Sequence, residues 1–171
     1  NNIESLKNKA LSNLNENRFM LFGMKEGDYP KLYYKKFNID INTENYFSDN
    51  NINSISLPVS DNNGNSIPFS VNDIYDINCL TNTICILSFI GKSSDFYVYR
   101  LNIESNSIKG YYNGSKYIQY FNMDEIQCES FDGINTFCYL LYKRTVVDYN
   151  GNINYIFHSY YIYINLNEVN E

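Results

Sequence analysis

The chain has 171 residues, a net charge of -6 at pH 7 and 17% aromatic side chains, most of them among its 18 Tyr residues. This length predicts a single domain, 1–171, that can bury a hydrophobic core. The acidic balance argues against a nucleic-acid-binding surface, because proteins that bind nucleic acid concentrate Lys and Arg to displace counterions.

The N-terminal end has the only helical spacing of apolar residues. These residues recur between positions 3 and 14, which predicts a short N-terminal helical segment within residues 1–15. From Arg18 onward, apolar and polar residues alternate with the period of β-strands. Residues 42–65 are rich in Asn, Asp and Ser and predict a long loop with one short strand near residues 54–58.

The clearest strands are residues 96–101 and 160–164, where Tyr alternates with aliphatic side chains. Such faces suit a half-buried sheet, with rings packed inward and hydroxyl groups near water. Asn-Gly and Asp-Gly pairs indicate hairpin turns, because type I′ turns need positive φ at both central residues. These pairs are Asn63-Gly64, Asn113-Gly114, Asp132-Gly133 and Asn150-Gly151.

A motif that occurs twice defines the organisation of the chain. Ile-polar-Cys is followed, after a gap, by Asn-Thr-apolar-Cys-apolar-Leu, once in residues 77–87 and again in residues 126–140. A third copy without cysteines starts at Asn17, and an aromatic segment follows each copy. Three repeats of about 50 residues predict an all-β protein of antiparallel strands arranged like propeller blades. A closed β-barrel and a trefoil are the alternatives.

The repeat selects one pairing of the four cysteines. Each motif places its two Cys residues on neighbouring antiparallel strands, where opposed Cβ atoms are close enough for a disulfide. We therefore predict the disulfides Cys79–Cys85 and Cys128–Cys138. Buried free thiols and a zinc site of four thiolates are alternatives, although the spacings are longer than in zinc knuckles.

Two disulfides predict an oxidising compartment, and we expect a secreted or cell-surface protein. The chain begins with Asn1, and we interpret it as a mature or trimmed chain from which any leader has been removed. The longest strongly apolar stretch, residues 84–90, is much shorter than the roughly 20 residues that cross a bilayer as a helix. We therefore expect no membrane insertion.

No catalytic motif accompanies the single histidine. His158 lies in a predicted strand without a nucleophile signature, and we expect a neighbouring group to satisfy it. The carboxylates near the cysteine motifs are expected to be solvated turn residues: Asp73, Asp76, Asp124, Glu125 and Glu129. The Asp-x-Asn-Gly-Asn patterns at Asp61 and Asp148 lack the full spacing of a calcium loop. We therefore predict no enzyme activity, no metal site and no cofactor.

The repeated, disulfide-bonded aromatic units resemble the propeller blades of the malaria cysteine-rich protective antigen family. The resemblance covers residues 17–171. It implies a six-bladed propeller that acts as a non-enzymatic adaptor in an invasion complex. Three repeats form only half of such a ring, so a second chain that completes the fold is a further expected partner.

The predicted function is a surface-exposed module that binds another protein. The residues predicted to bind this partner are Tyr111, Tyr112, Tyr117 and Tyr120, which cluster around the expected hairpin tip at residues 113–114. The same tyrosines could instead cover a sheet edge. The alternative function is a lipocalin-like small-molecule carrier, because residues 94–97 resemble a short segment of that family.

Overall fold

The computed structural model describes residues 7–15, 18–24, 31–40, 45–48, 52–56, 75–81, 83–90, 95–115 and 118–167. These residues form an all-β fold with no helix. The strands are β1 (Lys7–Asn15), β2 (Arg18–Met24), β3 (Lys31–Asp40), β4 (Asn45–Ser48), β5 (Asn53–Ser56), β6 (Tyr75–Cys79), β7 (Ile84–Ile90), β8 (Asp95–Asn102), β9 (Ser107–Ser115), β10 (Asn122–Ser130), β11 (Asn135–Val147) and β12 (Ile153–Asn165).

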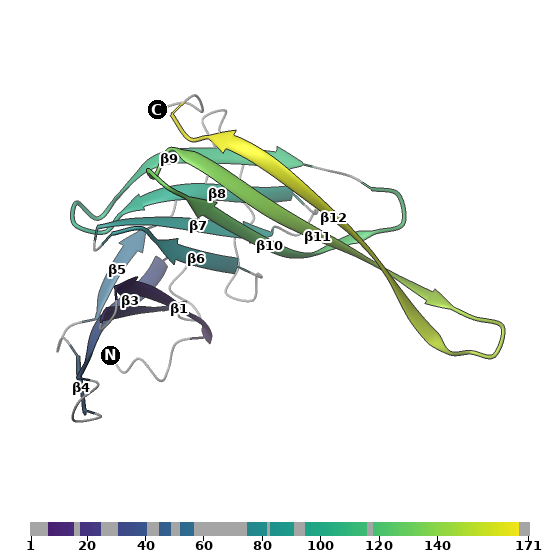
Figure 1. The fold of residues 1–171 in the computed structure, drawn as a ribbon, viewed down its shortest axis with the longest axis horizontal. Helices are drawn as coiled ribbons and strands as arrows, with labels where there is room; N and C mark the ends of the chain where they lie inside the picture. Colours follow the sequence, from purple (N-terminus) through teal and green to yellow (C-terminus); the bar gives the residue numbers. More distant parts are fainter. Residues whose placement is uncertain are drawn as a thin grey trace.

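The strands form three antiparallel sheets (Figure 1). The N-terminal sheet has the order β1-β2-β3-β4, with β5 also paired to β3. The middle sheet has the order β6-β7-β8-β9, and the C-terminal sheet has the order β10-β11-β12. None of the three closes into a barrel within the described residues, so the closed-barrel alternative is wrong for this part of the chain.

Each copy of the repeated motif lies in a sheet of its own. The first copy runs through β2 and β3, the second through β6, β7 and β8, and the third through β10, β11 and β12. The aromatic segment that follows each motif is the next antiparallel neighbour in the same sheet. Each of the two cysteine-bearing copies, together with its aromatic segment, therefore forms a meander of three antiparallel strands.

Both predicted disulfides are confirmed. Cys79 on β6 lies directly opposite Cys85 on β7, with their Cα atoms 3.9 Å apart. Cys128 on β10 lies opposite Cys138 on β11, with a Cα–Cα distance of 4.1 Å. No free cysteine is left, which excludes the alternatives of free thiols and a thiolate zinc site.

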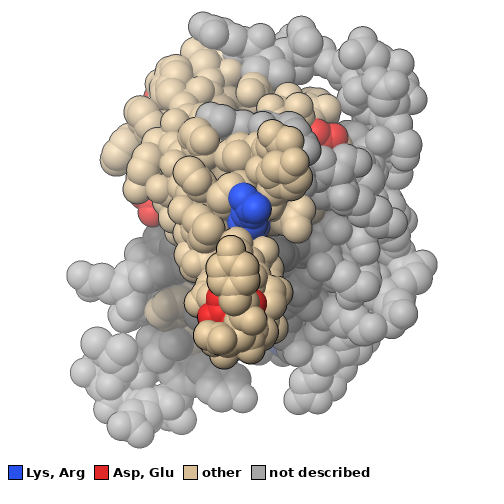
Figure 2. Space-filling model, turned by 90° about the vertical axis from the view of Figure 1, so that its right-hand side faces the viewer, with Lys and Arg blue, Asp and Glu red and all other residues tan. Residues whose placement is uncertain are grey.

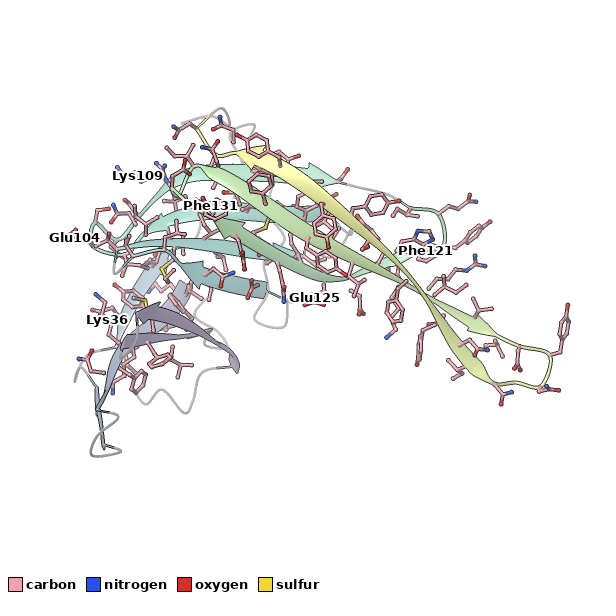
Figure 3. The ribbon with its side chains drawn as sticks, in the orientation of Figure 1. Lys36, Glu104, Lys109, Phe121, Glu125 and Phe131 are labelled. Atoms are coloured by element: carbon pink, nitrogen blue, oxygen red, sulfur yellow. A yellow bond between two sulfur atoms is a disulfide. The ribbon has the colours of Figure 1, made fainter. Side chains whose placement is uncertain are left out.

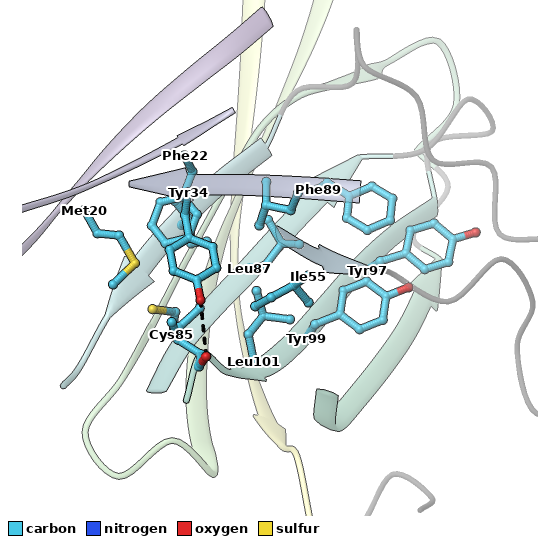
Figure 4. Close-up of a cluster of buried hydrophobic side chains, with 13 residues drawn as sticks. Met20, Phe22, Tyr34, Ile55, Cys85, Leu87, Phe89, Tyr97, Tyr99 and Leu101 are labelled. Atoms are coloured by element: carbon cyan, nitrogen blue, oxygen red, sulfur yellow. Dashed lines mark hydrogen bonds between the residues drawn. The ribbon is translucent and has the colours of Figure 1, made fainter. Parts of the chain in front are cut away.

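The middle sheet is buried on both of its faces. Its first face packs against the N-terminal sheet, where Tyr34 donates a hydrogen bond of 3.3 Å to the carbonyl of Ile103 (Figure 4). The buried side chains of this first core are Met20, Phe22, Leu32, Tyr34, Ile55, Ile77, Cys85, Leu87, Phe89, Tyr97, Tyr99, Leu101 and Ile103.

The opposite face of the middle sheet packs against the C-terminal sheet. The buried side chains of this second core are Ile86, Ile90, Phe96, Val98, Met123, Ile126, Cys128, Cys138, Leu140, Tyr142, Ile164 and Leu166. Because alternate residues of β7 and β8 contribute to the two cores, both strands read as nearly continuous apolar runs. Each core contains one disulfide motif.

The expected N-terminal helix is wrong, because Lys7–Asn15 forms the edge strand β1. Its pairing with β2 includes Ala10 opposite Phe22 and is interrupted by two register shifts. A helix of about a dozen residues is marginal in water by itself, so pairing with an existing sheet can override a helical spacing.

The hairpin tip expected at Asn113-Gly114 is also wrong, because both residues lie inside β9. Gly114 is opposite Phe96 on β8, and a Cβ atom on Gly114 would lie 2.5 Å from that ring. The glycine therefore makes room for an aromatic side chain. The turns at Asp132-Gly133 and Asn150-Gly151 are confirmed, but only their glycines have positive φ, so neither is the expected type I′ turn. Residues 63–64 lie outside the described residues.

Residues 42–65, expected to be a loop with one short strand, contribute two short strands in their described part. Both strands pair with β3. β4 pairs with the last residues of β3, and β5 pairs with the first residues of β3. Ile55 on β5 is fully buried in the first core, which explains why this polar segment is held against the sheet.

The strands β11 and β12 extend beyond the rest of the fold as a two-stranded ribbon (Figure 1). β10 accompanies β11 only as far as the pair Asn122 and Lys143. Residues 144–156, here called the projecting ribbon, consist of the two strand ends and the turn that joins them. Figure 2 looks toward this ribbon and shows charged atoms only in small areas of the described surface.

Removing a disulfide is expected to weaken the fold without abolishing it. In the chain-entropy model, closing loops with sequence separations of 6 and 10 stabilises the folded state by about 2–3 kcal/mol each. The double variant Cys128→Ala/Cys138→Ala should therefore lower the free energy of unfolding by about this amount in urea titrations. An unchanged unfolding midpoint would contradict a structural role for this bridge.

Candidate functional site

The outer face of the C-terminal sheet carries most of the exposed large hydrophobic side chains of the described residues. Along β11 and β12, alternate side chains point into the second core, and the side chains between them point away from it. The aromatic members of the outward set, here called the aromatic face, are Phe137, Tyr139, Tyr155, Phe157, Tyr161 and Tyr163.

The rings at the C-terminal end of β12 form two cross-strand pairs. Phe137 packs on Tyr163 and Tyr139 packs on Tyr161, each with ring centroids 5.3 Å apart. The hydroxyl group of Tyr163 also donates a hydrogen bond to Asn135 Oδ1. These contacts hold the rings in place before any partner binds, which reduces the entropy lost on binding.

The aromatic face continues toward the projecting ribbon. Tyr155 and Phe157 are neighbours on the same side of β12, with ring centroids 6.5 Å apart. The ammonium group of Lys143 lies 4.4 Å from the centroid of Tyr155, a cation–π distance. A basic group therefore lies among the rings at the ribbon end of the face.

Exposure separates the aromatic face from the other aromatic clusters. Tyr161 is 80% exposed, and Tyr155 and Phe157 are 53% and 52% exposed. Tyr142, on the inward side of β11, is completely buried, and desolvation together with the nearby Tyr160 raises its pKa to about 12. Large exposed apolar surfaces are uncommon on monomeric proteins and commonly indicate interaction sites.

A polar strip lies beside the aromatic face on β10. Its outward residues are Glu125, Gln127 and Glu129, and Gln127 donates a hydrogen bond of 2.8 Å to Glu125. Gln127 is opposite Tyr139 and Glu129 is opposite Phe137. The outer face of the sheet therefore passes from acidic on β10 to aromatic on β12.

Asp76 on β6 lies near this acidic strip. Asn78 donates hydrogen bonds of 3.1 Å to Asp76 and 2.9 Å to the carbonyl of Cys128, linking β6 to β10. Burial raises the pKa of Asp76, the backbone of Ile77 lowers it by hydrogen bonding, and the charges of Glu125 and Glu129 raise it further, so the net pKa is above the ordinary value.

The projecting ribbon and the turn before β10 form a second group of side chains. The guanidinium carbon of Arg144 lies 5.1 Å from the ring centroid of Tyr120. His158, expected to be satisfied by a neighbour, has its ring edge-on to Phe121 with centroids 4.6 Å apart. Figure 3 shows Phe121 where the ribbon leaves the body of the fold.

Asp148 organises the turn at the tip of the ribbon. Its carboxylate accepts hydrogen bonds from Asn152 Nδ2 and from the backbone amides of Asn152 and Asn150, at 2.8–2.9 Å. These bonds lower the pKa of Asp148, the bond from the Asn152 side chain most strongly. The Asp-x-Asn-Gly-Asn pattern here is therefore that of a turn cap; the matching pattern at Asp61 lies outside the described residues.

The structure does not place the predicted partner-binding tyrosines on one loop. Tyr111 and Tyr112 are adjacent on β9 and point to opposite faces of the middle sheet, as strand periodicity requires. Tyr111 stacks on Tyr99 at 5.0 Å between centroids, and Tyr112 packs on Phe96 at 5.7 Å. Both are half-buried at the margins of the two cores.

Tyr120 is the most exposed of the predicted tyrosines that the structure describes. It is 68% exposed, has a φ of 67° and lies in the turn before β10. Tyr117 lies outside the described residues. A role of these tyrosines in binding stays a prediction, and their placement favours Tyr120 over Tyr111 and Tyr112.

The alternation in residues 160–164 predicts a strand but does not identify its exposed face. The missed residues are Phe137, Tyr155, Phe157, Tyr161 and Tyr163. A usable signal was present, because β12 contains no Lys, Arg, Asp or Glu on either face. Strands with one solvated face usually carry charged residues there, so an uncharged strand indicates a face that another surface can cover.

Comparisons with known proteins give no relative. No protein-family model matches the chain, and no curated protein or solved structure is similar to it. The described residues also contain no helix long and apolar enough to cross a membrane. The site therefore has to be interpreted from its own geometry.

Replacing Asp76 by Asn should stabilise the protein at neutral pH. The folded state holds the Asp76 proton more tightly than the unfolded state, so the free energy of unfolding falls as the pH rises from the ordinary carboxyl value of 3.8 through the raised pKa. Asp76→Asn cannot ionise and should melt at a higher temperature at pH 7, and this difference should vanish below pH 3.8.

Melting curves between pH 3 and pH 7 would measure this difference. Glu104→Gln is the control, because it removes one negative charge from an exposed turn. A lower melting temperature for Asp76→Asn at pH 7, or a difference that does not change with pH, would contradict the environment of Asp76 described above.

Proposed function

We propose that this chain is a non-enzymatic, secreted or surface-exposed module that binds another protein through its aromatic face. The observation that carries this proposal is the exposure of ordered aromatic rings on a rigid sheet. Tyr and Phe are enriched at the centres of protein interfaces, where they supply contact area at little cost in conformational entropy.

The repeated motif indicates what kind of surface the partner offers. Phe137 and Tyr139 occupy the motif positions of Ile84 and Ile86 in the preceding copy. Ile86 is buried in the second core, where the C-terminal sheet covers the middle sheet. The aromatic face is thus the counterpart of a face that receives another sheet, and we propose that the partner also presents a sheet.

The same argument supports a relation to propeller blades. The two cysteine-bearing copies lie in two different sheets, and the cysteine-bearing face of the C-terminal sheet packs against the middle sheet. We propose that the three sheets are blade-like units and that a second chain continues the stack. This chain would cover the aromatic face in the way that the C-terminal sheet covers the middle sheet.

Charge adds a constraint on the partner. Glu125 and Glu129 border the aromatic face on one side, and Lys143 lies toward the ribbon. A partner with an apolar centre and a basic group opposite β10 would be complementary to this distribution. The two disulfides are compatible with an extracellular location of such a complex.

The double variant Tyr161→Ser/Tyr163→Ser tests the proposed surface. Both side chains are largely exposed. Truncating an aromatic residue that anchors an interface can reduce the binding free energy by about 2 kcal/mol or more, which is about 30-fold in affinity. The binding partner should first be isolated by quantitative affinity capture with the parent chain. The affinity of the variant for this purified partner should then fall at least about tenfold while its melting temperature changes little.

Tyr112→Ala is the matched control. Tyr112 packs against Phe96 beside the second core, so its removal should lower the melting temperature and leave the contact surface in place. An unchanged affinity of Tyr161→Ser/Tyr163→Ser for the partner would contradict the proposed binding site. If Tyr112→Ala lost affinity for the partner at unchanged stability, the binding site would instead include the tyrosines of β9.

A further inference from the structure

The described sheets differ in how their edges are protected. Edge strands present unpaired backbone groups, which proteins usually protect with charges, bulges or a cover. β9 has a register shift opposite Arg100 of β8 and carries the exposed Lys109. β10 combines a register shift after Met123 with three acidic residues, Asp124, Glu125 and Glu129.

β12 has none of these protective features. Its 13 residues pair with β11 without interruption, and no described strand lies on its other side. The strand contains no Lys, Arg, Asp, Glu, Pro or Gly, and most of its side chains are exposed. A long, regularly paired and uncharged edge of this kind is suited to pairing with another strand.

The register identifies the backbone groups that face this edge. The Cα–Cα distance of 4.1 Å between Cys128 and Cys138 is that of a non-hydrogen-bonded pair, so the backbone of Cys138 bonds to Ile162 on β12. Bonding alternates along the strand. The amide and carbonyl groups of Ser159, and of every second residue on either side of it, therefore point to the open edge.

The sequence of β12 is complementary to itself in the antiparallel direction. With a two-fold axis at Ser159, Tyr161 of one copy lies opposite Phe157 of the other, and Tyr163 lies opposite Tyr155. On the inward side, Ile162 lies opposite Ile156, which is 44% exposed in the single chain. Only the small Ser159 faces itself, and Tyr160 lies opposite His158, so large side chains pair with large ones near the axis. At the two ends Ile164 meets Asn154 and Asn165 meets Ile153.

We propose that β12 pairs with β12 of a second copy of this chain, antiparallel about Ser159, to form a continuous six-stranded sheet. In this dimer, residues 153–156 of the projecting ribbon lie beside residues 162–165 of the other copy. The ribbon thereby gains a third strand, which an isolated two-stranded hairpin needs for stability. Because β12 carries no charged side chain, the two paired strands bring no like charges directly opposite each other.

Two variants of Ser159 test the pairing and its register. Ser159 is exposed on the outer side of β12, so Ser159→Lys and Ser159→Asp should keep the fold, as circular dichroism and melting temperature would verify. The parent chain should show twice the chain mass of 20.1 kDa in sedimentation at about 100 µM, where weak association is populated by mass action. Each variant alone should show the mass of a single chain, because like charges then meet at the axis.

An equimolar mixture of the Lys and Asp variants should recover the doubled mass, because opposite charges meet at the axis. Thr145→Lys is the control, since Thr145 is exposed on β11, one strand away from the edge, and it should keep the doubled mass. A monomeric parent chain, doubled mass for either Ser159 variant alone, or no recovery in the mixture would each overturn the proposal. A parent monomer that binds an extended peptide along β12 would assign the edge to a different partner.

Discussion

The constraint on which the rest of the structure depends is the burial of both faces of the middle sheet. Leu87 and Tyr99 face the N-terminal sheet and Val98 faces the C-terminal sheet, all almost completely buried. Because β7 and β8 are apolar on both sides, they cannot fold as a sheet with a solvated face. They need a covering sheet on each side, and each covering interface contains one copy of the disulfide motif. The stack of three sheets follows from this requirement.

The C-terminal sheet ends this stack in the described chain, so its two faces have different surroundings. Cys138 and Leu140 point into the second core, while Phe137 and Tyr139 point outward with their rings already paired across the strands. Along β12, the same strand pair has an edge on which no described strand lies. The face and the edge are different surfaces, and their occupation by different molecules is geometrically compatible. The face fits a partner that presents a sheet, and the edge fits a strand.

Local patterns were sufficient for the strands and the disulfides, because alternation and the repeated motif act over a few residues. They failed where distant contacts decide. Gly114 makes room for Phe96 inside β9 instead of forming a turn, and Lys7–Asn15 pairs with β2 instead of forming a helix. Alternation also cannot tell which side of a strand is covered, so the exposed Tyr161 and its half-buried neighbour Tyr160 look alike in the sequence. For the same reason the half-buried positions of Tyr111 and Tyr112 could not be predicted.

The central claim is that the outer face of the C-terminal sheet is open while the rings between the sheets are enclosed. Tyrosine nitration of the native chain, mapped residue by residue by mass spectrometry, tests it directly. The account predicts rapid modification of Tyr161, comparable to Tyr149 at the fully exposed ribbon tip, and none of Tyr99 or Tyr142 until the protein unfolds. The raised pKa of Tyr142 would slow its reaction further. Protection of Tyr161 to the same degree as Tyr99 would contradict the account.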